Sequence, residues 1–212
     1  MASKRVLIVY YSYTQQTRLL LKKFSEGLAT ADISVTLQRL EPVSPYEFPF
    51  RSNLRLLWAM TVTFFRRRMA VKPPAEACFT DWDRIIVAGP TWSFQPSGPV
   101  LAFFDLYGSR LFAGRRVLPV ISCRSYWRWH LFSLRRALQR CGAQVDPPLV
   151  FCHPIREPWR VIGLVLQLRG KMVRRENSWF RRHYPGYGHS REQLDEAFAR
   201  GQQLADELLA QP

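Results

Sequence analysis

The hydrophobic positions of the chain fall into short apolar runs that alternate with amphipathic segments. Residues 5–11 (R-V-L-I-V-Y-Y) form a continuous run of β-branched and aromatic residues, which predicts a buried strand. Six short or polar residues follow. Residues 18–28 then place Leu20, Phe24 and Leu28 four apart, the spacing of an amphipathic helix. The chain therefore opens with a strand, a hydroxyl-rich turn and a helix.

The same alternation continues along the chain. Residues 33–40 alternate apolar and polar side chains and predict a half-buried strand at a sheet edge. The remaining predicted strands are residues 84–88, 116–122 and 144–152, and the predicted helices are residues 99–107, 131–141 and 190–209. Apolar strands separated by helices indicate an α/β domain with a parallel sheet covered on both faces. Five strands with this spacing predict one domain, residues 1–212, with the doubly wound strand order 2-1-3-4-5.

Prolines and caps mark where these elements end or are interrupted. Pro119 lies inside the fourth strand and Pro147-Pro148 interrupts the fifth, and a proline cannot donate to a strand ladder. We expect Gly142 to end the helix before it. Ser190 and Gln193 have the spacing of a capping box at the start of the last helix.

Two segments, about residues 41–79 and 151–189, do not fit the alternation and are predicted to be insertions. Each carries an apolar stretch of helix length with arginines and a tryptophan, at residues 54–68 and 158–175, and residues 177–188 are predicted to be irregular. This composition suits a membrane interface, where apolar side chains are buried, arginines reach phosphates and tryptophan lies among the headgroups. A lid over the core and a homodimer interface are the alternatives.

The net charge of the chain indicates which classes of binding partner it would attract. It carries 31 Lys and Arg against 16 Asp and Glu, a net charge of +15, and 47% of its residues are hydrophobic. The hydrophobic content indicates a globular protein, and the charge predicts attraction to nucleic acid, an anionic membrane surface or an anionic ligand. The chain has no recognised nucleic-acid motif, and its aromatic residues lie beside apolar runs, which disfavours nucleic acid.

The cysteines and the N-terminal sequence indicate the cellular compartment in which we expect the protein. Cys78, Cys123, Cys141 and Cys152 have no CxxC spacing, which favours reduced thiols in a cytosolic protein. The histidines have no close metal-ligand spacing, so we expect no metal site. We expect no signal peptide, and no apolar run reaches the ~18 residues that span a bilayer. The expected location is cytoplasmic, with peripheral contact to the inner face of the membrane as a further expectation.

Three loops of the predicted sheet are candidates for chemistry. Ligands of such sheets bind at the carboxyl ends of the strands, near the switch point between the first and third strands. The loops there are residues 12–17, 89–98 and 122–130. The first of them brings three hydroxyls and several backbone N–H groups to a helix N-terminus. Such a terminus suits an anion, typically a phosphate.

These loops carry a resemblance to flavodoxin-like FMN-binding proteins. Their phosphate loop, usually Y-S-x-T-G-N-T, is similar to V-Y-Y-S-Y-T-Q-Q-T in this chain. Their second loop and the helix after it resemble A-G-P-T-W-S-F-Q-P-S-G-P-V-L-A-F-F-D. Their third loop corresponds in position to S-C-R-S-Y-W. The resemblance covers residues 5–30 and 80–145. It implies a flavodoxin-like three-layer sandwich that binds FMN. It also implies an oxidoreductase or electron carrier, with NAD(P)H as a candidate donor and a hydrophobic or quinone-like compound or a redox protein as acceptor.

The resemblance also assigns the cofactor contacts, one loop at a time. In chain order they are Ser12, Tyr13, Thr14, Gln15, Gln16 and Thr17 for the phosphate, Pro90, Thr91, Trp92, Ser93 and Phe94 beside the flavin ring, and Cys123, Arg124, Ser125, Tyr126 and Trp127 on its other side. Gln15-Gln16 replaces the usual Gly-Asn, although glycine accepts positive φ more easily. Alternatives are a turn without a ligand for the first loop and packing against the insertions for Trp92 and Phe94. Cys123 is expected to pack at a strand end, and no catalytic acid or base can be named.

A second resemblance is narrower. R-L-E-P-V-S-P-Y-E-F-P-F, W-S-F-Q-P-S-G-P and C-R-S-Y-W are similar to flavodoxin-like proteins labelled as dialkylresorcinol-condensing enzymes, which implies aromatic lipid metabolism. The alternative function is therefore a flavin-free flavodoxin-like protein that serves as a membrane-associated or biosynthetic-complex component.

Overall fold

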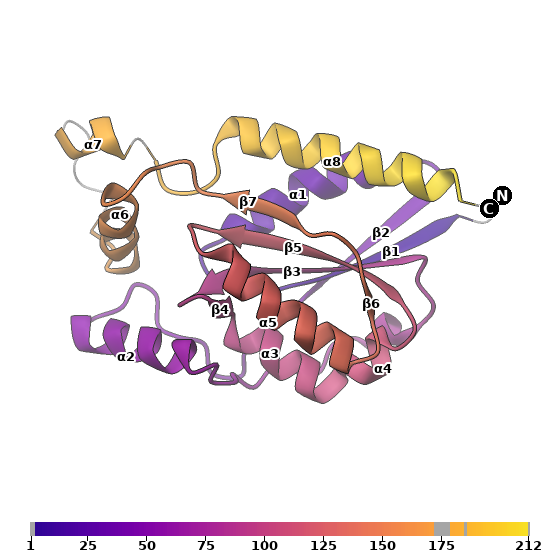
Figure 1. Ribbon diagram of the computed structural model, residues 1–212, viewed down its shortest axis with the longest axis horizontal. Helices are drawn as coiled ribbons and strands as arrows, with labels where there is room; N and C mark the ends of the chain where they lie inside the picture. The colour runs from indigo at the N-terminus through magenta and orange to yellow at the C-terminus, as the bar shows by residue number, and fades with distance from the viewer. Residues whose placement is uncertain (1–2, 172–178, 185, 212) are drawn as a thin grey trace.

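A twisted parallel sheet forms the centre of the protein (Figure 1). The computed structural model describes residues 3–171, 179–184 and 186–211. Its strands are β1 (Lys4–Tyr10), β2 (Ile33–Arg39), β3 (Arg84–Trp92), β4 (Gln95–Pro96), β5 (Arg116–Cys123), β6 (Gln144–Val145) and β7 (Leu149–Cys152). The order is β2-β1-β3-β5, with β6 and β7 both beside β5, and only β4 is antiparallel to its neighbour. The predicted order is confirmed, with the fifth strand present as two short pieces.

The break in the last strand lies opposite the proline of its neighbour. Arg116 and Val117 pair with β6, and Val120 to Cys123 pair with β7. Between these runs the register gives Leu118 and Pro119 no partner in the described part of the last strand. Pro119 cannot donate to a ladder, and Pro147-Pro148 lies between β6 and β7, so the lost pairing is confined to one place.

Helices cover both faces of the sheet, which makes the three-layer sandwich expected from the sequence. α1 (Gln16–Leu28) and α8 (Arg191–Leu209) cover one face; α3 (Gly98–Phe103), the π-helical turn η2 (Phe104–Gly108), α4 (Ser109–Phe112) and α5 (Trp127–Arg140) cover the other (Figure 1). The period-two alternation of β1 divides the core, because Val6 and Ile8 pack toward α1 and α8 while Leu7 and Val9 pack on the opposite side. The predicted caps are present: Gly142 has φ +78°, and Ser190 and Gln193 form the capping box.

Several predicted boundaries are wrong. The strand predicted for residues 84–88 extends to Trp92, and the helix predicted for residues 99–107 continues through α4 to Phe112. α5 begins at Trp127 rather than in the predicted range 131–141, because Tyr126 takes a left-handed conformation and starts the helix. The helix predicted for residues 54–68 is α2 (Asn53–Phe64), which ends before the arginines, and Arg66 has φ 60°. Part of the stretch predicted as irregular is helical, in α7 (Trp179–His183).

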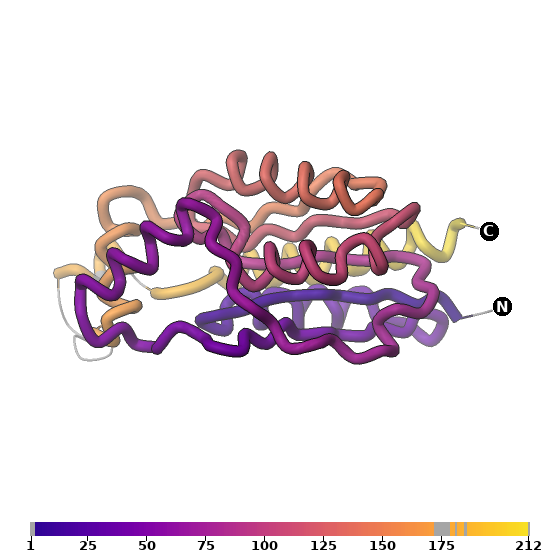
Figure 2. The backbone as a smooth tube through the Cα atoms, turned by 90° about the horizontal axis from the view of Figure 1, so that it is seen from below, coloured from indigo at the N-terminus to yellow at the C-terminus, as the bar shows by residue number. Residues whose placement is uncertain are grey.

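The apolar helices of the two predicted insertions lie at one end of the molecule. α2 and α6 (Trp159–Leu168) stand beyond the carboxyl ends of the strands, at the end opposite both termini (Figures 1 and 2). The prediction of a helix over 158–175 is correct for its first part, and residues 172–175 lie outside the described residues. A short 3₁₀ turn, η1 (Glu76–Phe79), completes the 41–79 segment. That the two segments are insertions stays a prediction.

None of the described helices is both long enough and apolar enough to cross a membrane.

Candidate functional site

The three predicted loops line a common cavity of about 280 Å³ at the carboxyl ends of β1, β3 and β5. Small-molecule sites typically measure ~300–1,000 Å³, so this cavity lies near their lower limit. Every predicted site residue lines it except Gln15 and Trp127. Trp127 packs against the core and lines a neighbouring recess with Arg124, Ser125 and Tyr126. Its contact with the cofactor stays a prediction.

The first loop presents backbone N–H groups for which the described part of the chain offers no acceptor. The start of α1 has no side-chain cap. Arg18 N donates to Ser12 Oγ (3.3 Å), but within the described residues no acceptor is found for the N–H groups of Tyr13 to Thr17. Thr14 Oγ1 accepts a hydrogen bond from the Tyr187 hydroxyl (3.0 Å). The loop therefore combines free donors, hydroxyls and the positive end of a helix dipole, which together suit a phosphate.

Gln15 has the backbone conformation that a glycine would adopt easily. Its φ is 65° and its ψ is −5°, in the left-handed region. This conformation costs a non-glycine residue roughly 1–2 kcal/mol. Gln16, by contrast, uses its side chain: its Oε1 accepts from the N–H of His189 (3.2 Å). The two glutamines therefore keep the shape of the turn and bind a second loop to it.

The second loop is a strained hairpin between β3 and β4. Ser93 and Phe94 both have positive φ, 42° and 70°, at a turn where Asn-Gly is usual. Trp92 lines the cavity but also contacts Tyr11 and Tyr46 edge-on or tilted, with ring centroids 5.4 and 5.8 Å away. Trp92 therefore both packs against residues 41–79 and faces the cavity.

The second loop is also held by a buried histidine. Thr91 Oγ1 lies 2.7 Å from Nδ1 of His130, on α5. His130 is fully enclosed, and burial lowers its pKa to about 3. The imidazole is therefore neutral at pH 7. It lies outside the residues that line the cavity, so its contact with Thr91 positions the loop.

The third loop joins the cavity to the 151–189 segment. Arg124 donates to the Tyr184 hydroxyl (3.1 Å) and lies over the ring of Tyr187 (4.4 Å to the centroid). Tyr126 is exposed and meets Phe94 edge to face at 4.8 Å. The second and third loops therefore contact each other through these two rings, both of which line the cavity.

The sequence did not predict a hydrogen-bonded chain in the cavity wall. Gln193 Nε2 donates to the Cys152 carbonyl, so its Oε1 is an acceptor and faces Nδ1 of His189 at 3.2 Å. His189 Nδ1 therefore carries the proton, and Nε2 accepts from the Ser122 hydroxyl at 2.8 Å. Burial lowers the pKa of His189. Both ring nitrogens are engaged, so this neutral imidazole can take up a proton from a ligand only by way of the Ser122 hydroxyl. The sequence did not reveal this hydrogen-bonded chain, because Ser122 lies far from His189 and Gln193 in the sequence.

Apolar residues from the two predicted insertions form the outer wall of the cavity. They come from the end of the Pro-rich stretch, from α2 and from α6: Phe50, Leu56, Ala59, Met60, Val161, Leu164 and Leu168. The sequence predicted that these stretches are helical, but it could not predict which face of each helix points toward the three loops. The cavity thus has a polar floor at the strand ends and an apolar outer half.

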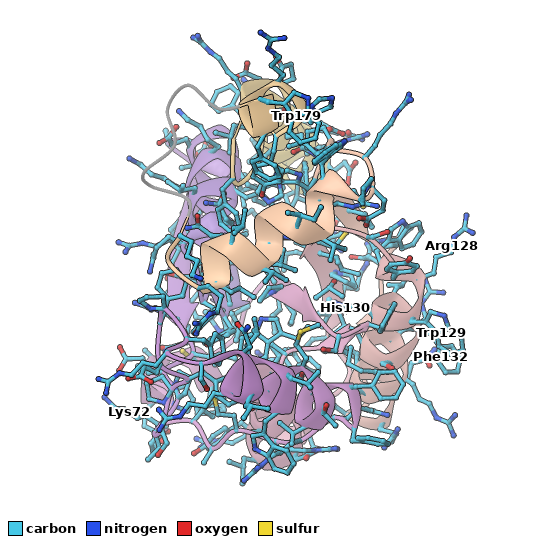
Figure 3. All side chains as sticks on the ribbon, turned by 90° about the vertical axis from the view of Figure 1, so that its left-hand side faces the viewer. Lys72, Arg128, Trp129, His130, Phe132 and Trp179 are labelled. Carbon is cyan, nitrogen blue, oxygen red and sulfur yellow. The ribbon has the colours of Figure 1, made fainter. Side chains whose placement is uncertain are left out.

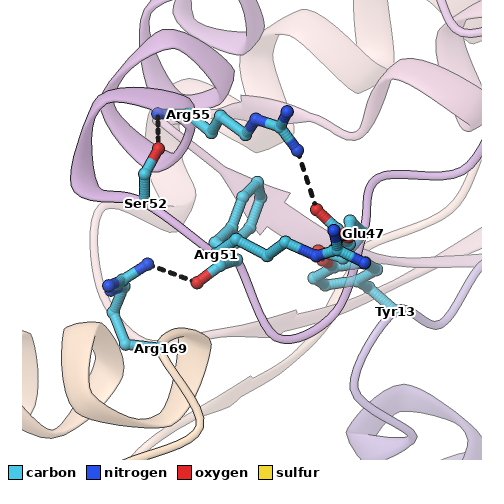
Figure 4. A network of polar contacts seen from close by, with 7 residues as sticks. Tyr13, Glu47, Arg51, Ser52, Arg55 and Arg169 are labelled. Atoms are coloured by element: carbon cyan, nitrogen blue, oxygen red, sulfur yellow. Dashed lines mark hydrogen bonds and ion pairs between the residues drawn. The ribbon is translucent and has the colours of Figure 1, made fainter.

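The two segments are joined to each other where they meet (Figure 4). Phe50 N donates to the Leu168 carbonyl (2.8 Å), and the Arg169 guanidinium donates to the Phe50 carbonyl. Glu47 pairs with Arg51 and Arg55, and its carbonyl accepts from the Tyr13 hydroxyl (2.8 Å). The network connects both segments to the first loop.

Comparison with known proteins places the fold. No family model and no curated protein matches the chain. Among solved structures, the chain is similar to a flavoprotein in complex with FMN from Lactobacillus acidophilus, with 16% identity, 70% of this chain and 93% of that one covered, and a TM-score of 0.54. It is similar to oxidised flavodoxin 1 from Bacillus cereus (12% identity, 99% of each chain, TM-score 0.54). An NADH:FMN oxidoreductase in its apo form also matches, at 15% identity over 99% of this chain and 92% of that one, with a TM-score of 0.52.

At these identities the likeness is one of fold. It confirms the flavodoxin-like fold that the loop sequences imply. The narrower resemblance to proteins labelled as dialkylresorcinol-condensing enzymes stays a prediction.

Proposed function

We propose that the chain is an FMN-binding redox protein. The observation that carries the proposal is the set of N–H groups at the start of α1 that have no acceptor among the described residues and lie beside a cavity lined by all three loops. A helix N-terminus of this kind is a ready site for a phosphate. Similar folds in flavodoxins and in an NADH:FMN oxidoreductase support the same assignment. Bound FMN would supply the hydride and electron-transfer chemistry, and the protein would supply position and electrostatics.

We propose the following residues for each part of the cofactor. Ser12, Thr14, Thr17 and the N–H groups of the first loop would hold the phosphate. The second and third loops would hold the ring, with Trp92 on one side and Tyr126 on the other. Arg124 lines the same cavity, and its positive charge would stabilise a reduced, anionic ring.

The apolar outer half of the cavity points to the acceptor class. Leu56 and Ala59 from α2 and Leu164 and Leu168 from α6 surround space next to the polar floor. A hydrophobic or quinone-like compound would bury apolar surface there at ~25 cal/mol per Å². NAD(P)H is the electron donor that we propose.

A flavin titration tests the proposal. We expect the purified protein to bind FMN and quench its fluorescence, and Trp92→Ala to weaken binding by roughly 0.5–1.5 kcal/mol, the worth of an aromatic contact beyond area burial. Trp129→Ala is the matched control, because Trp129 is exposed on α5 outside the cavity lining (Figure 3).

A protein that takes up no flavin would overturn the proposal and leave the flavin-free biosynthetic role as the better one. Equal affinity of wild type and Trp92→Ala would reject only the stacking role. Oxidation of NAD(P)H by the flavin-loaded protein, with and without a quinone, tests donor and acceptor separately.

We propose that the end of the molecule formed by α2 and α6 docks on an anionic membrane surface. Its exposed apolar side chains include Leu54, Leu57, Trp58, Phe64 and Phe65 from the α2 region, and Val161 and Ile162 from α6. Arginines follow α2 directly, and both helices also line the cavity. A hydrophobic acceptor could then pass from the bilayer into the cavity.

Charge favours a bilayer over a second copy of the chain as the occupant of this apolar end. A second copy carries the same net charge of +15, so the two molecules repel each other. An anionic leaflet attracts nearby basic residues by ~1 kcal/mol each. Two exposed tryptophans fit the headgroup level of a membrane: Trp58 on α2, and Trp179 on α7, which Figure 3 labels.

A further inference from the structure

Two cysteine thiols touch at the edge of the cavity. Cys123 ends β5 and Cys152 ends β7, and the two residues are direct partners in the parallel ladder. Their sulfur atoms lie 2.9 Å apart. Neighbouring strands are about 4.8 Å apart, which is inside the 4.4–6.8 Å range of Cα separations that disulfides span. The backbone therefore already holds these residues at a distance that a disulfide can bridge.

We propose that Cys123 and Cys152 form a reversible dithiol–disulfide pair that exchanges with small-molecule disulfides, a second two-electron redox site beside the cavity. The site is independent of the proposed flavin chemistry, because it needs only the two thiols and an external disulfide as oxidant. The remaining cysteines, Cys78 and Cys141, are buried elsewhere in the core as free thiols.

The two sulfurs differ in access, and this assigns their roles. Cys152 is partly exposed and lines a surface recess together with Arg124, Arg128 and Arg160. Cys123 is buried at 6% exposure and borders the main cavity. Attack on a disulfide requires a thiolate with access to solvent, so Cys152 is the attacking thiol and Cys123 the resolving one.

The surroundings of Cys152 favour its thiolate. A hydrogen bond from the Cys123 thiol and the positive charge of Arg160 lower the pKa of Cys152 to about 7, against the opposing effect of burial. Arg160 is held in place, because its guanidinium donates to the Arg124 carbonyl (2.6 Å) and pairs with Glu157 (2.8 Å). The pKa of Cys123 is raised, in keeping with a thiol that stays protonated until it resolves.

The exchange is balanced in two steps. The Cys152 thiolate attacks one sulfur of the external disulfide, whose S–S bond breaks; a mixed disulfide forms and one thiolate leaves. Cys123 then gives up its proton and attacks the Cys152 sulfur, which forms the Cys123–Cys152 bond and expels the second thiolate. The protein loses two electrons to the external disulfide, and protons end on the released thiols.

Peptide mapping after exposure to oxidised glutathione tests the proposal. The folded protein is incubated, quenched with acid, alkylated under denaturing conditions and cleaved after Lys and Arg. We expect peptide 117–124 joined to peptide 141–156, and loss of the joined species after reduction. Because peptide 141–156 also holds Cys141, the map is repeated in Cys141→Ser, which should give the same cross-link.

Two variants separate the roles. Cys123→Ser should accumulate glutathione on Cys152, because the resolving thiol is gone, whereas Cys152→Ser should remain free of both glutathione and cross-link. Full alkylation of Cys123 and Cys152 in the wild type after oxidised glutathione would overturn the proposal, and so would a cross-link from Cys141 instead. Fragmentation of the wild-type joined peptides, which shows whether Cys141 or Cys152 carries the bond, decides the question even if a variant fails to fold.

Discussion

One residue of the first loop, Gln15, has a backbone conformation that is unfavourable for a residue with a side chain. Gln15 lies at φ 65° with no side-chain cap, at the position where the resembling loops carry glycine. Strain of this kind persists where the surrounding structure requires it, and it clusters at ligand sites. Glutamine in place of glycine therefore raises the conformational free energy of the loop but leaves its backbone conformation unchanged.

We expect Gln15→Gly to stabilise the protein by roughly 0.5–1 kcal/mol. The relief of left-handed strain exceeds the extra freedom that glycine gains in the unfolded chain. Denaturant unfolding measures the change. Gln16→Gly is the control and should destabilise, because Gln16 is helical and its side chain accepts from His189. A destabilised Gln15→Gly protein would show that the glutamine side chain makes a contribution larger than the strain.

His130 gives the protein a predictable weakness in acid. Its pKa in the folded state is about 3, against 6.5 for the free side chain. A depressed pKa means that the contribution to stability is complete above pH 6.5 and is lost as the pH falls from 6.5 toward 3. While only the unfolded state is protonated, the loss is about 1.4 kcal/mol per pH unit.

We therefore expect His130→Asn to have a shallower stability slope than wild type between pH 6.5 and pH 5, by about 1 kcal/mol per pH unit. Asparagine can keep a hydrogen bond to Thr91 but does not titrate. Denaturant unfolding at several pH values gives the two slopes. Parallel slopes would show that His130 is protonated in the folded protein as easily as in the unfolded one.

At the scale of elements, two glycines let α1 and α8 approach closely. A Cβ at Gly201 would lie 2.2 Å from the Phe24 carbonyl oxygen, and one at Gly27 would lie 2.1 Å from that of Phe198. Both contacts are with backbone, which cannot rotate away. The crossing of the two helices is thus fixed by residues without side chains.

Gly201→Ala should destabilise the protein by about 1–3 kcal/mol, the usual cost of overpacking, even though alanine is the better helix former. Gln202→Ala, at the exposed neighbouring position, should change stability by less than about 0.5 kcal/mol. Thermal or denaturant unfolding compares the two. A stabilised Gly201→Ala protein would mean that the helices can separate at little cost.

Elements with a strong period could be predicted, and those placed by tertiary contact could not. The local sequence was sufficient to predict the apolar strand β1 and the capping box of α8. The start of α5 did not, because it depends on Tyr126 adopting a left-handed conformation at the edge of the cavity. Likewise the loops of the site were predictable as strand ends, whereas Ser122 and His189 are far apart in sequence and meet only when the chain folds.

At the scale of the whole molecule, charge and apolar surface point the same way. The chain has a net charge of +15, and its exposed apolar helices gather at the end that carries the cavity (Figures 1 and 3). Trp129 and Phe132 project from α5 at the side of this end (Figure 3). Exposed apolar side chains that gather beside a cavity are typical of an interaction surface, and the membrane docking proposed above would use this surface.

Vesicle co-sedimentation follows from this arrangement. We expect the protein to sediment with vesicles that contain phosphatidylserine, to bind neutral vesicles weakly, and to be released by salt, because the Debye length shortens from about 10 Å at 0.1 M to 3 Å at 1 M. Trp58→Ser should reduce binding several-fold, since it removes an exposed aromatic side chain from α2. Leu209→Ser is the matched control, an exposed apolar residue near the C-terminus at the opposite end.

The outcomes of that experiment divide the alternatives. Binding that is indifferent to lipid charge and salt would reject the electrostatic surface. No vesicle binding, together with a dimer in analytical ultracentrifugation that Trp58→Ser breaks, would assign the apolar end to a second copy. Because Trp58 is exposed and makes no part of the buried core, its loss should leave the flavin titration unchanged. Membrane docking and cofactor binding can therefore fail independently.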